Sequence, residues 1–203
     1  MKTSKEKNLT PVQIPTKVLT TLALLVAMNA VLNDGFAIRF ELLKFNFGFI
    51  TVIMAGVLYG PWASMAVGAM GDVLGLLIFP VVGTPNPIFT IIAGVNGLIY
   101  GLCLYSKKRE FSNKELLIRS AVAAFLVTQV MYTVVNSLVL SHLYGLVYIV
   151  PTETGYELTA VMITRIFKNF FLFYINMMVI PVVFECKQRI QKFSFGGTVK
   201  TTV

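Results

Sequence analysis

The sequence predicts an all-α integral membrane protein with six transmembrane helices and with its N- and C-termini in the cytoplasm. The chain of 203 residues is 56% hydrophobic and only 13% charged, whereas soluble domains carry about a quarter charged residues. Its apolar residues fall into long blocks, roughly the 17–25 residues that a bilayer demands. The cations gather in the two tails and in one short central loop, as the positive-inside bias predicts.

Six apolar blocks are separated by charged stretches and by breaks at proline and glycine. The expected spans are residues 17–33, 47–59, 61–79, 88–105, 116–144 and 158–185. The second is short and ends at Gly60-Pro61, where a proline can open the next helix. We therefore expect a cytoplasmic tail over 1–16, a six-helix membrane domain over 17–185 and a second cytoplasmic tail over 186–203 in a multi-pass protein of the cell membrane.

The net charge of +8 describes membrane topology and not a nucleic-acid partner. Most of the cations flank the apolar blocks on the sides expected to be cytoplasmic. The first block follows a basic tail and could be mistaken for a cleaved signal sequence. No convincing small-residue cleavage site closes it, so we expect a retained first helix.

Polar residues follow one face of two expected helices, since helix faces repeat at i, i+3, i+4 and i+7. On the last span this face carries Arg165, Lys168, Asn169 and Asn176, with Leu172 among them. The stripe on the fifth consists of Gln129, Tyr132, Thr133, Asn136 and Ser137. Asp72 lies midway along the third span. Ionisable groups in a membrane normally face the protein interior or a wet cavity, because lipid exposure costs several kcal/mol. The pattern predicts a cavity between helices.

Each of these residues also has a purely structural alternative. Arg165 and Lys168 lie near the outer end of their span and could extend to lipid headgroups. Asp72 could pair with one of these cations or cap a break in its glycine-rich helix. Gln129 and Asn136 could join helices by hydrogen bonds.

Small residues recur on the first span, where Ala23, Ala27 and Ala30 share one face. Such faces let helix backbones approach closely. Packing within the chain is the simpler explanation of this pattern, and an external helical partner is the alternative.

Motifs for chemistry are missing from the sequence. There is no phosphate-binding G-x-x-x-x-G-K-[ST] loop and no H-E-x-x-H zinc motif, and His142 is the single histidine. We therefore expect no enzyme, no metal site and no cofactor. A binding protein without its own motor fits best, and a self-contained proton-coupled carrier that uses Asp72 is the alternative.

The stretch from Phe45 to Leu102, "FNFGFITVIMAGVLYGPWASMAVGAMGDVLGLLIFPVVGTPNPIFTIIAGVNGLIYGL", resembles the substrate-binding S-component of energy-coupling-factor (ECF) vitamin transporters, specifically the folate branch. The elements that carry the resemblance include Gly60-Pro61, Gly71-Asp72 and the Gly97–Gly101 run. "VVNSLVL" and "TRIFKNFF" further along are similar to that branch's fifth and sixth helices.

The resemblance implies a protein that captures a vitamin, folate in this branch, at the outer face of the membrane. It implies partners as well: a transmembrane coupling subunit (ECF-T) and two ATPase subunits that supply the energy. The small-residue face of the first helix would dock the coupling subunit, which maps here onto Ala23 and Ala27, with Ala30 on the same face.

Folate has a flat pterin, an aromatic linker and an anionic glutamate, so the resemblance also suggests roles for single residues. The cations expected around the carboxylates are Arg39, Lys44, Arg165 and Lys168. The polar groups expected at the pterin are Asp72, Gln129 and Asn136. The residues expected to line the rings are Phe47, Phe79, Phe89 and Tyr132, with Asn46 beside them. A different vitamin or another anionic heterocycle is the alternative cargo.

Overall fold

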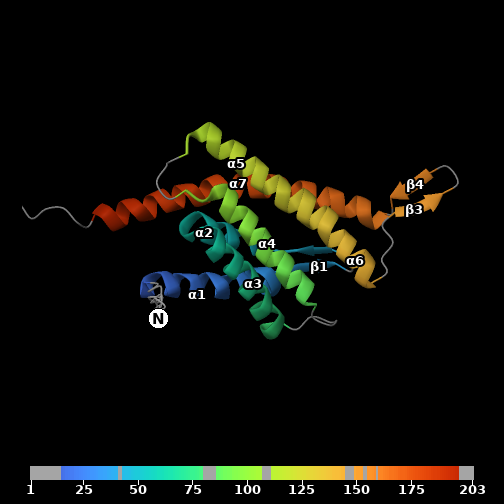
Figure 1. Ribbon diagram of the computed structural model, residues 1–203, viewed down its shortest axis with the longest axis horizontal. Coiled ribbons are helices and arrows are strands. Elements are labelled where there is room, and N and C mark those ends of the chain that lie inside the picture. Colours follow the sequence, from blue (N-terminus) through green and yellow to red (C-terminus); the bar gives the residue numbers. More distant parts are fainter. Residues whose placement is uncertain are drawn as a thin grey trace, which may run out of the picture.

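The computed structural model describes residues 15–40, 43–79, 86–106, 111–144, 149–152, 155–158 and 160–196. Its α-helices and π-helical segments (η) are α1 (Thr16–Ala30), η1 (Val31–Gly35), α2 (Phe49–Tyr59), α3 (Pro61–Ile78), α4 (Pro87–Leu104), α5 (Asn113–Phe125), η2 (Leu126–Val135), α6 (Asn136–Tyr144) and α7 (Ala160–Gly196). Its strands are β1 (Ile38–Phe40), β2 (Leu43–Phe45), β3 (Ile149–Thr152) and β4 (Gly155–Leu158). The helices pack into one elongated bundle (Figure 1).

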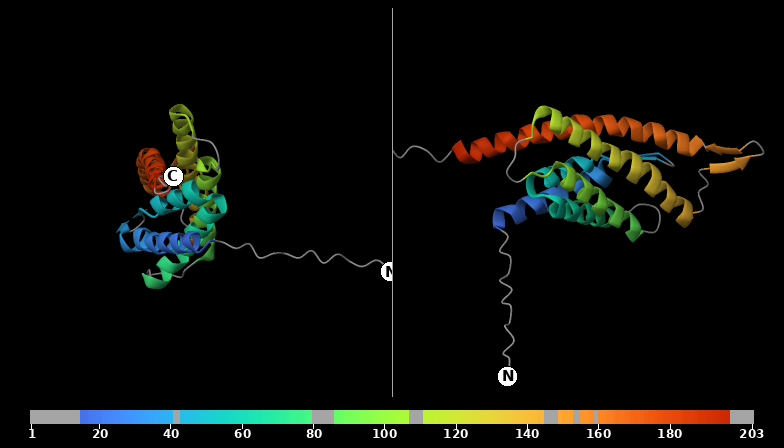
Figure 2. Two further views of the ribbon diagram at one scale, coloured as in Figure 1. Left: turned by 90° about the vertical axis from the view of Figure 1, so that its left-hand side faces the viewer. Right: turned by 45° about the horizontal axis from the view of Figure 1, so that its top comes forward.

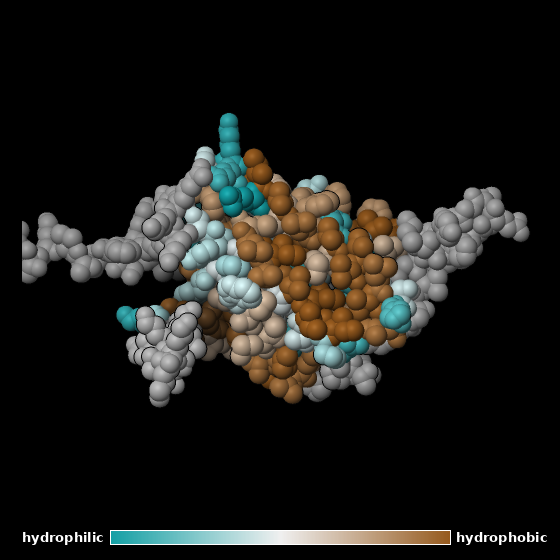
Figure 3. All heavy atoms as spheres, in the orientation of Figure 1, coloured by the Kyte–Doolittle hydropathy of each residue, from teal (hydrophilic) through white to brown (hydrophobic). Residues whose placement is uncertain are grey.

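Within the described residues, five helical segments are long and apolar enough to cross a membrane. They are Thr16–Gly35, Pro61–Ile78, Pro87–Leu104, Asn113–Leu143 and Met162–Arg189. Large apolar side chains on them point outward, among them Leu77, Phe167 and Met178, each more than 70% exposed. Apolar residues cover most of the described surface in the face shown in Figure 3. Such a surface suits lipid and would be an aggregation liability in water.

The second expected span is much shorter than the others. α2 has 11 residues, which rise about 16 Å, about half of the hydrocarbon core of a bilayer. It ends at Gly60, whose φ of 95° is the left-handed conformation that favours glycine. Pro61 then begins α3 at its first helical position, as the sequence predicts.

The last helix is longer than expected. α7 continues to Gly196, so the helix extends beyond the expected span into the region 186–203 expected as a cytoplasmic tail. Pro181 lies inside this helix without ending it. The expected boundary at 185 lies where charged residues begin, but these mark the end of the apolar block and not the end of the helix.

The described residues include two antiparallel hairpins, whose strands the all-α prediction did not contain. Residues of β1 and β2 pair as Ile38↔Phe45, Arg39↔Lys44 and Phe40↔Leu43, and β3 pairs with β4. Apolar and polar residues alternate in β1 and β2 with the period of a strand, but three residues are too few to stand out in a sequence. Both hairpins lie at one end of the bundle, and both ends of the described chain lie at the other (Figure 2, right).

The bundle's apolar core lies nearer the end opposite the hairpins. Its buried residues come from α2, α4, α5, η2 and α7, and include Ile53, Val57, Leu104, Val127 and Ile180. This core separates the polar residues described below from the end of the bundle where the chain starts.

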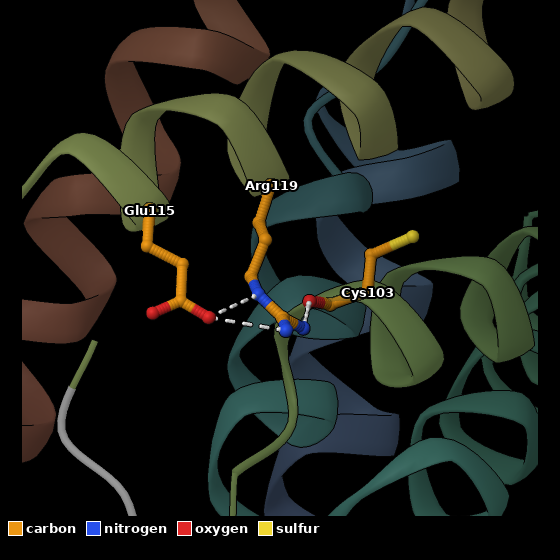
Figure 4. A network of polar contacts seen from close by, with 3 residues as sticks. All are labelled: Cys103, Glu115 and Arg119. Atoms are coloured by element: carbon orange, nitrogen blue, oxygen red, sulfur yellow. Dashed lines mark hydrogen bonds and ion pairs between the residues drawn. The ribbon is translucent and has the colours of Figure 1, made fainter. Parts of the chain in front are cut away.

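Two cations close that end of the bundle. The Lys187 Nζ donates to the Val57 carbonyl in the last turn of α2, at 2.9 Å. The Arg119 Nη1 donates to the Cys103 carbonyl in the last turn of α4, at 3.2 Å, while Glu115 accepts from the same guanidinium (Figure 4). Cations at helix C-termini satisfy carbonyls that have no partner within the helix.

Glycines let helices α3 and α4 pack closely against each other. A Cβ at Gly97 would collide with the Ser64 carbonyl oxygen, and one at Gly101 with Pro61. The Ser64 hydroxyl also donates to the Val52 carbonyl at 2.7 Å, which ties α2 to the same pair. The glycine-rich sequence of both helices is therefore a packing requirement.

We expect Gly97→Ala to destabilise the protein. The new methyl group would overlap the Ser64 backbone, and overpacking of this kind costs about 1–3 kcal/mol. Gly94→Ala is the matched control, because the nearest atom to its Cβ would lie 3.5 Å away and alanine suits a helix interior better than glycine. Thermal unfolding in detergent should give a lower Tm for Gly97→Ala only. Equal Tm values for the two variants would contradict the close packing.

Candidate binding site

The two polar stripes predicted from the sequence face each other in the structure. The Asn169 Nδ2 on α7 donates to the Thr133 hydroxyl on η2 at 2.8 Å. One turn away, the Arg165 Nη1 donates to the Ser137 hydroxyl on α6 at a longer 3.5 Å. We call the set of polar residues between these helices, α3 and α4 the polar core. It consists of Asp72, Asn96, Gln129, Tyr132, Thr133, Asn136, Ser137, Arg165 and Asn169.

A π-helical segment turns the fifth span's polar residues toward α7. η2 covers Leu126–Val135, and the Thr133 hydroxyl donates to the Thr128 carbonyl five residues earlier, at 3.1 Å. π-helical turns are rare and occur frequently at functional sites. The sequence carries no signal for this segment, and the predicted stripe assumed ordinary α-helical spacing.

Several buried atoms of the polar core have no hydrogen-bond partner among the described residues. Those on uncharged side chains are the Asn96 Oδ1, the Gln129 Nε2, the Asn136 Oδ1 and the Asn169 Oδ1. A buried polar atom left unsatisfied costs about 1–3 kcal/mol, and native proteins leave few of them. These four come from α4, η2, α6 and α7, so one molecule between these helices could satisfy several at once.

Asp72 joins the polar core from α3. Its Oδ2 accepts from the Thr90 hydroxyl on α4 at 2.7 Å, and its Oδ1 accepts from the Asn33 Nδ2 at 3.5 Å. Its charge lies within electrostatic range of Tyr132, whose hydroxyl also interacts with Asn96. α3 runs unbroken through this position, so Asp72 does not cap a helix break.

The two cations of the last span lie close together at the hairpin end of the polar core. Arg165 is 9% exposed, so its side chain is turned into the protein and does not extend to headgroups. Lys168 lies near enough to Arg165 for their charges to repel. Two like charges in a partly buried place favour a negatively charged partner.

The hairpin of β1 and β2 brings the other predicted cations to the same end. Arg39 and Lys44 are paired residues on neighbouring strands, although their side chains lie outside the described residues. The Phe45 ring, next in the chain, lies 5.8 Å from the Lys168 Nζ, a cation–π contact that joins the hairpin to α7. Asn46 follows directly and is half-buried.

The predicted aromatic residues do not form one group. Tyr132 lies in the polar core, within electrostatic range of Asp72. The Phe79 ring instead lies against Gly35, at the end of η1. Phe47 is 39% exposed, and Phe89 is half-buried in the first turn of α4. Roles for Phe47, Phe79 and Phe89 at a ligand therefore stay predictions.

Sequence reasoning missed several polar residues that the structure places in or beside the polar core. Asn96 is only 4% exposed, yet it lies between glycines in a segment that reads as a packing face. Thr90 and Asn33 contact Asp72, but neither was given a ligand role. An asparagine within an apolar block was the available signal for Asn96. For Thr90, nothing in the sequence distinguishes it from a threonine bonded within its own helix.

The exposed side of α1 matches part of the predicted docking face. Ala23 and Ala27 are exposed, but Ala30 is fully buried. The prediction that Ala30 lies on an exposed docking face is wrong, because the last turn of α1, with Asn29 and Ala30, is buried in the bundle. Ala23 and Ala27 stay predictions for contact with a partner.

A membrane-embedded helical bundle with a buried and incompletely satisfied polar core has the properties of an integral membrane binding protein. The chain belongs to the family of ECF transporter substrate-specific components, whose family model matches residues 17–184. The family predicted from the sequence is thereby confirmed, and the protein is a multi-pass membrane protein that serves transport.

Individual relatives place the chain more closely within this family. It is 30% identical to the "Folate transporter FolT" of Clostridium novyi (strain NT) over 174 residues, which are 86% of this chain and 91% of that protein. It is similar to a crystal structure of FolT bound with folic acid, with a TM-score of 0.67, 30% identity, and coverage of 81% of this chain and 90% of that one. A structure of the S component of a bacterial ECF transporter, 21% identical, shares the fold with a TM-score of 0.60 over 89% of this chain and 98% of that one.

Proposed function

We propose that this chain is a folate-binding S-component that captures its substrate at the outer face of the membrane. It delivers the vitamin inward together with a transmembrane coupling subunit and two ATPases, and it acts by binding and not as an enzyme. The similarity to folate transporters supports the choice of vitamin.

The observation that carries this proposal is the set of unsatisfied atoms in the polar core. Three of them, on Asn96, Asn136 and Asn169, are acceptors, and the one on Gln129 is a donor. A pterin ring carries both amino or ring N–H donors and ring acceptors, so it matches this mixture. The polar core thus offers hydrogen bonds to a flat heterocycle and has helices on several sides to enclose it.

The cations at the hairpin end suit the other half of folate. Arg165 and Lys168 lie near one another at that end, and the paired positions Arg39 and Lys44 belong to the hairpin that contacts Lys168. We assign these four residues to the glutamate carboxylates. Guanidinium groups bind carboxylates in a bidentate way, and partial desolvation strengthens such pairs. Asp72 and the aromatic residues named above, with Asn46, would complete the site.

The arrangement of the helices supports six spans with both termini in the cytoplasm. The start of α1 and the C-terminal end of α7 lie together at the end of the bundle away from the hairpins (Figure 2). Exposed cations lie near that end, including Lys17, Lys114 and Arg189, as the positive-inside bias requires. In this topology the short helix α2, second along the chain, is counted with the five longer segments to give six, and it packs on α3, α4 and α7. The membrane domain then covers 17–185, and the tails are 1–16 and 186–203.

Equilibrium binding of a panel of vitamins to the purified protein in detergent tests the proposal. We expect folate to bind most tightly, with other vitamins at least about a hundredfold weaker, because a mismatched ligand leaves buried polar groups unpaired. Preference for another vitamin would keep the family and overturn the cargo. Uptake by the chain alone in vesicles under a pH gradient, without ATP, would instead favour a proton-coupled carrier.

Asn136→Leu should separate stability from binding. The Asn136 Oδ1 is buried without a described partner, so an apolar side chain of similar volume should leave the empty protein as stable or more stable. Folate should then raise the Tm less than in the unchanged protein, because one ligand contact is lost.

Asn176→Leu is the matched control for that variant. Asn176 is fully buried, accepts from the Tyr100 hydroxyl at 2.6 Å and donates to the Leu172 carbonyl at 2.8 Å. Its replacement should lower the Tm of the empty protein by breaking satisfied hydrogen bonds. If both variants lowered the Tm of the empty protein equally, Asn136 would be a structural residue that joins helices by hydrogen bonds.

A further inference from the structure

Asn33 connects the outer end of the first span to Asp72. Its Nδ2 donates to the Asp34 Oδ2 at 3.0 Å and reaches the Asp72 Oδ1 at 3.5 Å. An amide NH2 has two hydrogens, so this one group can donate to both carboxylates. The Thr90 hydroxyl holds the second oxygen of Asp72 at 2.7 Å.

The backbone around Asn33 is shaped to place it there. Asn33 lies in the π-helical segment η1, and π-helical turns redirect side chains relative to the preceding α-helix. Asp34 is buried against Gly75 of α3, where a Cβ would collide with its carboxylate. On the other side, a Cβ at Gly48 would lie 2.9 Å from the Asn33 Cβ. Asn33 is therefore confined between α2 and α3, with its amide turned toward Asp72.

We propose that Asn33 is a positioning residue, which fixes the Asp72 carboxylate of α3 in the orientation that the ligand requires. Asp72 has two oxygens, one held by Thr90 on α4 and one by Asn33 on the first span. Without the amide, the carboxylate loses one of the groups that orient it, on the side that faces the first span. Asn33 thus acts on the ligand through Asp72, and this role rests on the proposed function.

A double-mutant cycle on folate affinity tests this role. The variants are Asn33→Leu, Asp72→Asn and the two together, with the Tm of each measured in detergent to monitor folding. Asn33→Leu has a similar volume and no donor. We expect it to raise the Kd for folate about tenfold when Asp72 is present and less than about threefold in the Asp72→Asn background, because a positioning effect disappears with the group that is positioned. Asn113→Leu, at the exposed start of α5, is the control and should leave the Kd unchanged.

An equal effect of Asn33→Leu in both backgrounds would overturn the proposal and show a general structural role. If Asn33→Leu does not fold, Asn33→Ala removes the same amide without adding apolar bulk and carries the same cycle. The proposed function fails separately: in that case the unchanged protein would not bind folate at all. If the unchanged protein binds folate tightly and the effects of Asn33→Leu and Asp72→Asn on the binding free energy are additive, only the role of Asn33 is refuted.

Discussion

Replacing Arg165 and Lys168 together by alanine is expected to weaken folate binding by more than tenfold, which is at least about 1.4 kcal/mol. Both cations lie at the hairpin end of the polar core, and Arg165 is 9% exposed, so a carboxylate bound there is partly shielded from water. Hydrogen bonds to charged groups contribute about 1.5–3 kcal/mol each. Isothermal titration of the purified variant with folate measures the change.

The double variant should still fold, and its Tm in detergent checks this. The substitutions remove the repulsion between Arg165 and Lys168 together with the 3.5 Å contact of Arg165 to Ser137. Lys17→Ala with Arg189→Ala is the matched control, because it also removes one lysine and one arginine, both exposed near the other end of the bundle. A folded Arg165→Ala/Lys168→Ala protein with unchanged folate affinity would refute the carboxylate assignment.

The membrane spans could be predicted well from the sequence because a bilayer imposes a minimum length on each apolar block. The predicted break at Gly60-Pro61 coincides with the junction of α2 and α3, since glycine and proline each have a specific backbone requirement there. Where no such requirement exists, prediction failed. The end of α7 lies at Gly196, well beyond the apolar block, because lipid no longer constrains the helix there.

The polar core was predicted in outline from helical periodicity alone. Thr133 and Asn169, from the two stripes, are hydrogen-bonded across the interface. Asn33, Thr90 and Asn96 were missed because their importance depends on which helices meet. A single amide or hydroxyl in an apolar helix looks the same whether it bonds within its own helix or faces another one. Only the tertiary arrangement brings Asn33 and Thr90 to the two oxygens of Asp72.

Ala27→Trp is expected to abolish uptake by the complete transporter and to spare folate binding. Ala27 lies on the exposed side of α1, and a small residue there allows a partner helix to approach closely. An indole in its place would hold the two backbones apart, so uptake should fall more than about tenfold in membranes that contain the coupling subunit and both ATPases. The Kd for folate should change less than about twofold, because the side of α1 that packs on the bundle is formed by other residues, including Leu25, Val26 and Asn29.

Met178→Trp provides the comparison for this variant, since it adds an indole to another outward-facing position. Met178 is 77% exposed on α7, which lies across the bundle from α1 (Figure 1). Tryptophan is tolerated where a side chain meets only lipid, so uptake by Met178→Trp should remain close to that of the unchanged protein. If Ala27→Trp lost binding along with uptake, the effect would be misfolding. If it lost neither, the coupling subunit would have to dock elsewhere, because an interface that needs small residues cannot accept an indole at its centre.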